Sequence, residues 1–190
     1  GHRWMGVAEA VRGLKGEGLR VSIDSFDPLE VADAVAAGAE LVLSVNATNR
    51  DRAADWGVEV VVIPDEPHSL DGLEATGNFL TSKGVAHRLD PVLDPIGFGF
   101  SASLGRFLDA RRAFPEHEIM MGIGNLTELT DVDSAGVNTV LVGACQEIGV
   151  RSVLTTEVIN WARSSVKEID LARRLMFHSI NKKVLPKHLE

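Results

Sequence analysis

Polar side chains gather where the short apolar runs of this sequence end, and their types suit a ring that carries N–H groups. Asp24, Asn46 and Asp90 each follow such a run, as do Asn125 and Thr156. A carboxylate accepts two parallel N–H hydrogen bonds, and an amide donates and accepts at once. Together these groups predict recognition of a neutral, donor-rich heterocycle such as a fused aminopyrimidinone.

Each of these residues also has a purely structural interpretation. An Asp or Asn at a strand end is often the N-cap of the following helix. The glycine pairs in residues 97–100 and 122–124 have the backbone freedom to hold a phosphate, although such pairs more often relax a turn. Phe98 and Phe100 lie among these glycines and are candidates for covering a flat ring.

Composition excludes several classes of function. The chain has 19 Lys plus Arg against 27 Asp plus Glu, a net charge of −8 that repels nucleic acid and anionic membranes. Its apolar runs are far shorter than the roughly 20 residues that span a bilayer. The six histidines show no paired spacing and Cys145 is the only cysteine, so we expect a core thiol, no metal site and a cytoplasmic protein.

The elements that position these residues follow a repeated strand–helix pattern. β-Branched runs alternate with stretches of helical period at a spacing of roughly 30 residues, which predicts a parallel sheet. The carboxyl ends of parallel strands share one face, so the polar residues should converge there. The predicted strands are residues 19–24, 40–46, 58–64, 86–92, 118–123 and 151–157.

Four helices are marked by period and by end signals. Residues 28–38 have Asp27 as N-cap, Pro28 in the first turn and Gly38 as C-cap. The other predicted helices are residues 7–16, 131–149 and 159–182, the last of them amphipathic. No linker composition divides the chain, which predicts one domain over residues 1–190.

With these motifs the sequence resembles the pterin-binding superfamily of (β/α)8 barrels, which includes dihydropteroate synthase and the methyltetrahydrofolate:corrinoid methyltransferases. Residues 21–25 resemble the strand with the first pterin aspartate, and residues 45–49 the later strand with an asparagine. Residues 89–91 resemble the aspartate that pairs with the ring N–H groups. The resemblance therefore implies a pterin site made by Asp24, Asn46 and Asp90.

The register of the third motif is ambiguous. Residues 93–100 also resemble the LDPGFGF segment of the synthases, which makes Asp94 an alternative to Asp90 and adds Phe98 and Phe100 as candidate contacts. Asp90 is preferred because it ends the predicted strand.

A narrower resemblance concerns residues 120–131 and 154–157, which are similar to dihydropteroate synthase-related proteins of organisms that use tetrahydromethanopterin. The Ser-Arg-Lys and Arg-x-His segments of the synthases are replaced by Gly124-Asn125-Leu126 and Leu154-Thr155-Thr156, which removes positive charge suited to a pyrophosphate. Gly124-Asn125 resembles the methyltransferase segment whose asparagine approaches pterin N5. Thr156 and Glu157 are further possible contacts.

The implied reaction condenses an activated hydroxymethyl-dihydropterin with an arylamine in folate or tetrahydromethanopterin biosynthesis. No residue is assigned a catalytic role and no tightly bound cofactor is expected, although Mg²⁺ would accompany a pyrophosphate substrate. One alternative is methyl transfer between a reduced pterin and a corrinoid protein partner. Another is a pterin-binding module without catalysis.

Chain length sets a last expectation. A (β/α)8 barrel needs about 250 residues, whereas this chain has 190 and six recognisable strands. Since residues 21–25 resemble the third barrel strand, we expect an incomplete TIM-barrel-like fold without the first two units, in a fragment of a longer protein. Open strand edges recruit other chains, which predicts a homodimer.

Overall fold

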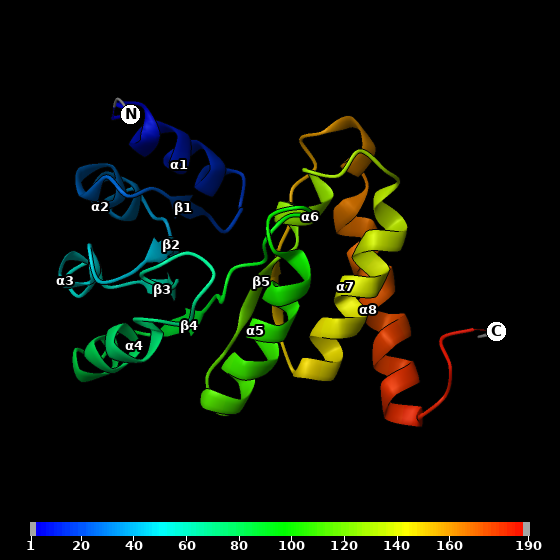
Figure 1. Cartoon of the computed structure of the whole chain (residues 1–190). Coiled ribbons are helices and arrows are strands. Elements are labelled where there is room, and N and C mark those ends of the chain that lie inside the picture. The colour runs from blue at the N-terminus through cyan, green and yellow to red at the C-terminus, as the bar shows by residue number, and fades with distance from the viewer. Residues whose placement is uncertain (1–2, 188–190) are drawn as a thin grey trace. The chain divides into compact units, whose positions relative to one another are not determined.

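The computed structural model describes residues 3–187, an α/β chain in which helices alternate with parallel strands (Figure 1). All six predicted strand runs contain a strand. The strands are β1 (Ser22–Asp24), β2 (Leu41–Val45), β3 (Glu59–Val62), β4 (His87–Leu89), β5 (Met120–Gly122) and β6 (Ser152–Leu154).

The helices fill the intervals between these strands. The helix predicted for residues 7–16 is confirmed with both bounds. The helices are α1 (Val7–Gly16), α2 (Pro28–Ala36), α3 (Arg50–Ala53), α4 (Leu73–Ser82), α5 (Phe100–Ala113), α6 (Gly124–Thr127), α7 (Ser134–Ile148) and α8 (Ser165–Lys182), with a 3₁₀ turn η1 (Asn160–Ala162). Within residues 3–187 no helix is both long and apolar enough to cross a membrane.

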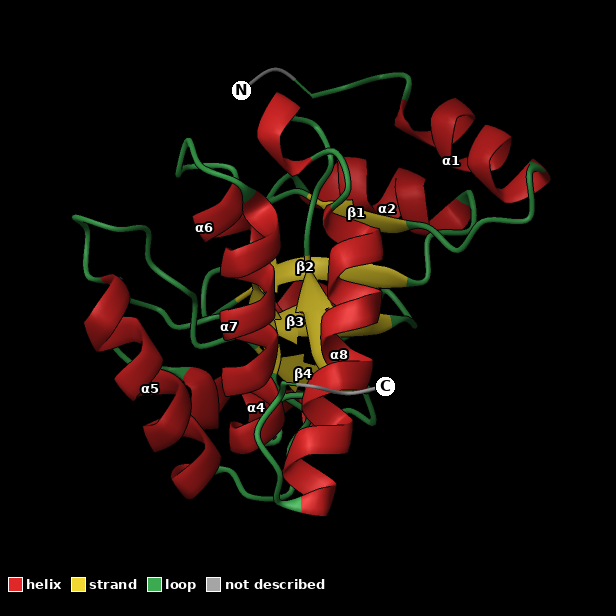
Figure 2. Ribbon diagram, turned by 90° about the vertical axis from the view of Figure 1, so that its right-hand side faces the viewer, coloured by secondary structure: helices red, strands yellow, loops and turns green. Residues whose placement is uncertain are grey.

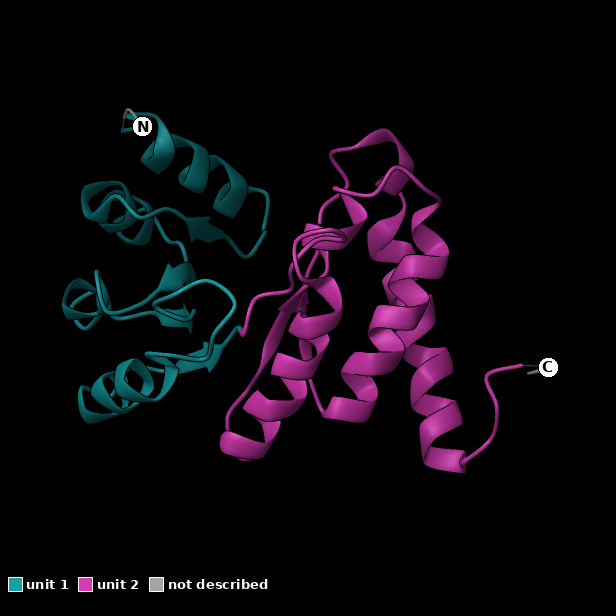
Figure 3. Cartoon of the chain, viewed as in Figure 1, with its two compact units in different colours: residues 1–90 teal, residues 91–190 magenta. Residues whose placement is uncertain are grey.

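The chain divides into two compact units, Gly1–Asp90 and Pro91–Glu190 (Figure 3). Unit 1 holds a four-stranded sheet in the order β1-β2-β3-β4, and unit 2 holds the pair β5-β6. Every strand pair is parallel. The predicted parallel α/β architecture is confirmed, and the two sheets are open, as in an incomplete barrel.

In unit 1 the strands start at nearly the same level, so their carboxyl ends lie at one edge. Ser22 pairs with Leu41, which pairs in turn with Glu59, and Val60 pairs with His87. Figure 2 shows the strands in this order within the sheet. The side chains of β3 are buried at three successive positions, as expected for an inner strand covered on both faces.

Helix α2 begins as the sequence predicts. The Asp27 carboxylate accepts hydrogen bonds from the backbone N–H groups of Leu29 (2.9 Å) and Glu30 (3.2 Å), and Pro28 is the first helical residue. The predicted C-cap is wrong by one residue. Ala37 is the C-cap, and Gly38 takes the next position with φ of +114°, which glycine adopts readily.

The long helices α7 and α8 of unit 2 run parallel to each other, and the predicted start of α8 is wrong. Helix α8 begins at Ser165 rather than at residue 159. The Trp161 indole N–H donates to the Thr127 carbonyl (2.8 Å), which holds η1 against α6. The Glu157 carboxylate then accepts from the Val166 N–H (3.0 Å) in the first turn of α8. These two contacts explain why the residues before Ser165 form a 3₁₀ turn and a loop instead of extending the amphipathic helix.

A polar cluster joins α7 to α8 around Glu168. One carboxylate oxygen accepts from Ser134 Oγ (2.8 Å) and Asn138 Nδ2 (2.7 Å), and the other from Ser164 Oγ (2.6 Å). Desolvation raises the pKa of Glu168, but the three hydrogen bonds outweigh it and hold the pKa below its usual value. The cluster therefore fixes the register of the two helices while Glu168 is ionised.

This cluster predicts a pH-dependent contribution to stability. A carboxyl group with a lowered folded-state pKa stabilises the protein above its unfolded pKa, and that contribution is lost as the pH falls through the folded pKa. Glu168→Gln should lower the free energy of unfolding by about 1–2 kcal/mol at pH 7. In urea unfolding, its deficit against wild type should shrink below about pH 4.5. Glu147→Gln, at an exposed site on α7, is the matched control, and a deficit for Glu168→Gln that stays constant with pH would contradict this account.

Candidate functional site

Three of the four predicted ring contacts lie at the carboxyl edge of the unit 1 sheet. Asp24 ends β1, Asn46 follows β2 and Asp90 follows β4. Asp90 continues the strand pairing, because its N–H donates to the Val62 carbonyl (2.8 Å), and its side chain is only 8% exposed. Asp24 is exposed and Asn46 is half-buried. The parallel sheet therefore places two carboxylates and an amide at one edge, as the sequence predicts.

A bulge in β2 directs a hydroxyl toward Asp24. The β2–β3 register shifts between Val42 and Val45, and Ser44 adopts φ of +71° there. Ser44 Oγ donates to the Asp24 carboxylate (3.2 Å). Bulges commonly re-aim side chains near active sites. Here the bulge gives Asp24 a hydrogen-bond partner from the adjacent strand.

The amide oxygen of Asn46 is used by its own turn. It accepts from both the N–H (3.0 Å) and the hydroxyl (2.6 Å) of Thr48, while the Asn46 N–H donates to Asn49 Oδ1 (2.9 Å). Asn49 Nδ2 donates in turn to the Ser44 carbonyl (3.2 Å). The side-chain oxygen of Asn46 therefore stabilises the turn. A contact from Asn46 to a ring would have to come from its Nδ2 group.

Asp65, which follows β3, supports this turn from the neighbouring strand. One of its carboxylate oxygens accepts from the Ala47 N–H (2.8 Å). The carboxylate lies against Gly72, where φ is +84° and a Cβ atom would overlap it. Residue 72 must therefore be glycine for two reasons, its backbone conformation and the close approach of Asp65.

In unit 2, a buried arginine that the sequence reasoning missed holds the segment after β4. Arg106 donates to the carbonyls of Pro91 (3.3 Å) and Val92 (2.7 Å) and to the Asp94 carboxylate (2.7 Å). The Asp94 N–H also donates to Ser103 Oγ (3.1 Å). The carboxylate of Asp94, the alternative ring contact, is therefore engaged within the protein.

The position of Arg106 on its helix was the available signal. It shares one face of α5 with three other buried residues, at the spacing of successive helical turns. An arginine on such a face needs internal acceptors, because a buried guanidinium without them is costly. The other residues of this face are Ser103, Phe107 and Ala110.

The remaining candidates in unit 2 lie in helices α5 and α6 or directly before α5. Asn125 is exposed in α6, the short helix that follows β5, and its Nδ2 donates to the Leu93 carbonyl (3.0 Å). Phe98 is 72% exposed, and Phe100 is the half-buried first residue of α5. Neither aromatic belongs to the buried core.

Two carboxylates follow β5 and β6 in the chain, one beyond α6 and one in the loop after β6. The Thr156 hydroxyl donates to Glu128, which follows α6. Glu157 binds the start of α8. The sequence predicted Thr156 and Glu157 as contacts but gave no signal for Glu128. This edge of unit 2 therefore has an acidic character.

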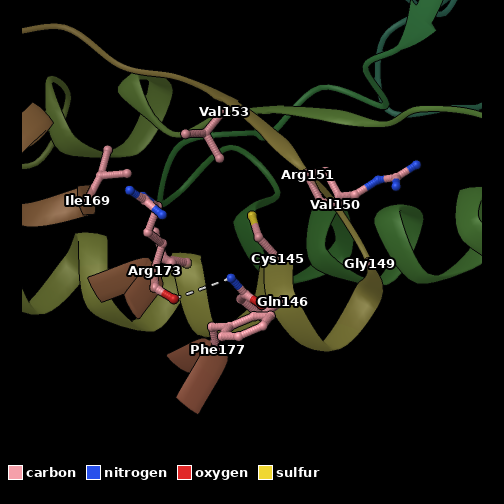
Figure 4. A pocket seen from close by; sticks show the side chains of 10 residues that line it. Cys145, Gln146, Gly149, Val150, Arg151, Val153, Ile169, Arg173 and Phe177 are labelled. Atoms are coloured by element: carbon pink, nitrogen blue, oxygen red, sulfur yellow. Dashed lines mark hydrogen bonds between the residues drawn. The ribbon is translucent and has the colours of Figure 1, made fainter. Parts of the chain in front are cut away.

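Other features of the described part of the chain lie elsewhere. Cys145 is 3% exposed, and burial raises the pKa of its thiol to about 12, which confirms it as a core residue. A cavity of about 310 Å³ lies near Cys145 at the amino end of β6, and Gln146 donates to the Arg173 carbonyl beside it (Figure 4). None of the predicted ring contacts lines it. Residues 3–187 contain no group of three His, Cys, Asp or Glu suited to a metal ion.

Comparison with solved structures places this arrangement among known folds. The dihydropteroate synthase of Thermus thermophilus in complex with 4-aminobenzoate is 21% identical, with a TM-score of 0.63 over 90% of this chain and 74% of that one. The Yersinia pestis synthase with a sulfonamide drug is 16% identical, with a TM-score of 0.67 over 93% and 72%. The chain has a dihydropteroate synthase-like fold.

Sequence comparison adds a longer relative. An uncharacterized protein of Methanocaldococcus jannaschii, MJ0107, is 32% identical over 189 residues, which is 89% of this chain and 35% of that protein. The chain thus spans about a third of the length of this curated relative. No family model matches the chain.

The contact between Gly72 and Asp65 predicts an unequal response at two glycines. Gly84 has a similar φ of +71° with open space around it. Gly84→Ala should therefore cost only the conformational penalty of about 1–2 kcal/mol. Gly72→Ala should cost about 1 kcal/mol more in urea unfolding, because Asp65 must leave the Ala47 N–H.

An Asp65→Ala background tests the cause. There, Gly72→Ala and Gly84→Ala should cost the same, since no carboxylate remains to be displaced. Equal costs in the wild-type background would contradict the proposed contact.

Proposed function

We propose that this protein binds a pterin ring at the carboxyl edge of the unit 1 sheet. The observation that carries the proposal is the placement of buried Asp90 at the end of β4, at the same edge as Asp24 and Asn46. Neighbouring strands lie about 4.8 Å apart, so the ends of β2 and β4 are separated by about 10 Å, a span that suits a fused bicyclic ring held at both sides.

The proposed contacts follow from the polar groups of the ring and of the protein. The Asp90 carboxylate accepts two N–H bonds from the aminopyrimidinone edge, and the Asn46 Nδ2 donates to a ring acceptor. Asp24, oriented by Ser44, accepts from a further ring N–H. Asn125 in unit 2 stays a predicted contact through its resemblance to the methyltransferase asparagine.

The first candidate reaction is the condensation of an activated hydroxymethyl-dihydropterin with an arylamine, in folate or tetrahydromethanopterin biosynthesis. It is supported by the fold, since the Thermus thermophilus synthase of this fold was solved with 4-aminobenzoate. In this reaction the protein positions the two reactants and stabilises the departing charge. Mg²⁺ would enter with the pyrophosphate rather than as a resident ion.

The residues at the ends of β5 and β6 favour a second candidate, methyl transfer between a reduced pterin and a corrinoid protein. Glu128 and Glu157 lie close in sequence to the two segments that replace the cationic segments of the synthases, and their negative charges would repel a pyrophosphate. Asn125 has the amide that would stabilise a protonated N5. A pterin-binding module without catalysis uses the same ring contacts and is the third candidate.

We also propose that this chain is one part of a longer protein. The matched relative is about three times as long as the aligned region, which supports a longer protein around the pterin-binding domain. We also propose that the open strand edges pair two copies of the chain, in a cytoplasmic homodimer.

Asp90→Asn tests the ring site directly. The variant should bind pterin about 10- to 150-fold more weakly, because hydrogen bonds to a charged acceptor contribute about 1.5–3 kcal/mol. Isothermal titration calorimetry measures the affinity. Asp51→Asn, on an exposed position of α3 in the same unit, should bind normally. Unchanged affinity for Asp90→Asn would contradict the assignment, and a loss confined to Asp94→Asn would transfer it to Asp94.

The acidic ends of β5 and β6 predict the response to a pyrophosphate. Pterin pyrophosphate with Mg²⁺ should bind no more tightly than pterin itself, because Glu128 and Glu157 oppose the added charge. Replacing both with Gln should favour the pyrophosphate ligand, while Glu147→Gln should not. A pyrophosphate that strengthens binding to the wild-type protein would instead establish the condensation as the better candidate.

A further inference from the structure

The cavity of about 310 Å³ in unit 2 is enclosed by α7, α8 and β6. Ile169, Arg173 and Phe177 line it from α8, where a spacing of four residues places them on one face of the helix. Figure 4 shows these side chains together with those that line the cavity from α7 and β6. The volume lies at the lower end of the range for ligand sites, about 300–1,000 Å³, so it suits one ring or a short branched chain.

The inner part of the cavity is apolar. Val142, Cys145 and Ile169 are 4%, 3% and 9% exposed. The side-chain amide of Gln146 donates to the Arg173 carbonyl (3.4 Å) and is used there. An ordered water needs two to four polar partners, which the three buried side chains do not provide. The inner walls therefore favour an apolar group as occupant.

Contacts outside the cavity hold its walls in place. Arg111 donates to the carbonyls of Ile148 (3.1 Å) and Gly149 (2.9 Å), which fixes the turn from α7 into β6. The polar cluster around Glu168 joins α7 to α8. Because these contacts do not use the side chains that line the cavity, the space is already formed when a ligand arrives. Such preorganisation lowers the free-energy cost of binding.

The mouth of the cavity carries positive charge. The Arg173 side chain is 58% exposed, and its Nε donates to Asp170 (2.9 Å). The other carboxylate oxygen of Asp170 lies 2.6 Å from Arg174 Nη2. One carboxylate therefore balances two guanidinium groups, which leaves a net positive charge on this part of α8. A guanidinium donates in a planar fork that matches a carboxylate or a phosphate.

We propose that this cavity binds a small organic acid, with the apolar body of the acid between α7, α8 and β6 and its anionic group on Arg173. The observations that carry the proposal are the apolar inner walls and the excess of guanidinium over carboxylate at the mouth. None of the predicted ring contacts lines the cavity, so the inference does not depend on the proposed pterin binding.

The test uses phenylacetate as the probe and phenylacetamide, which has the same ring without the charge, as its matched control. Binding to the full chain is followed by NMR of the methyl groups. Both probes should shift the methyl signals of Val153 and Ile169 and leave those of Val60 and Val61, in the core of unit 1, unchanged. Phenylacetate should bind about 2- to 5-fold more tightly than phenylacetamide, as expected for a partly exposed charge pair.

Variants test the charged contact and the apolar space separately. Arg173→Gln should weaken phenylacetate to the affinity of phenylacetamide and leave the amide unaffected. Arg112→Gln, which removes an exposed arginine of α5 that pairs with Asp109, should bind both probes like wild type. Val153→Phe should fill the cavity and abolish binding of both, with circular dichroism as the check on folding. If Val153→Phe fails to fold, the smaller change Val153→Leu replaces it and should weaken both probes.

Three outcomes would overturn the proposal. The first is phenylacetate that leaves the Val153 and Ile169 methyl signals unshifted. The second is an equal loss of acid and amide in Arg173→Gln, because Arg173 would then not recognise the charge. The third is a shift of these methyl signals with protein concentration in the absence of a probe, accompanied by self-association in sedimentation velocity, because a second copy of the chain would then fill the space.

Discussion

Parallel pairing of β1 to β4 is the constraint on which the candidate site depends. In a parallel sheet every strand presents its carboxyl end at the same edge, so residues far apart in the sequence meet without any contact of their own. Asp24, Asn46 and Asp90 are brought to one edge in this way. The loops after the strands then determine which of the polar atoms form hydrogen bonds within the protein.

Those loops are held by side chains that the ligand does not need to touch. Asp65 supports the turn after β2 from the end of β3, and Gly72 makes room for it. Arg106 performs the corresponding role in unit 2 for the segment that begins at Pro91. Asp65 accepts from a backbone N–H, and Arg106 donates to two backbone carbonyls as well as to the Asp94 carboxylate, so each charged group stabilises the geometry of a loop.

The sequence predicted features that depend on local order. All six strands and the N-cap Asp27 followed from periodicity and end signals. It did not predict Arg106 or the Ser44 bulge, because both depend on contacts between separate elements. The start of α8 was missed for the same reason, since η1 is held by a hydrogen bond from Trp161 to Thr127.

A polar residue at a strand end can cap the next helix only where that helix begins a few residues later in the chain. Helix α3 begins at Arg50, so the turn of Asn46 and Asn49 runs directly into it, and the Asn46 oxygen is used there. Helix α5 begins only at Phe100, with Gly99 as its N-cap, so Asp90 is too far from it to cap it. The capping interpretation therefore applies to Asn46 and does not apply to Asp90.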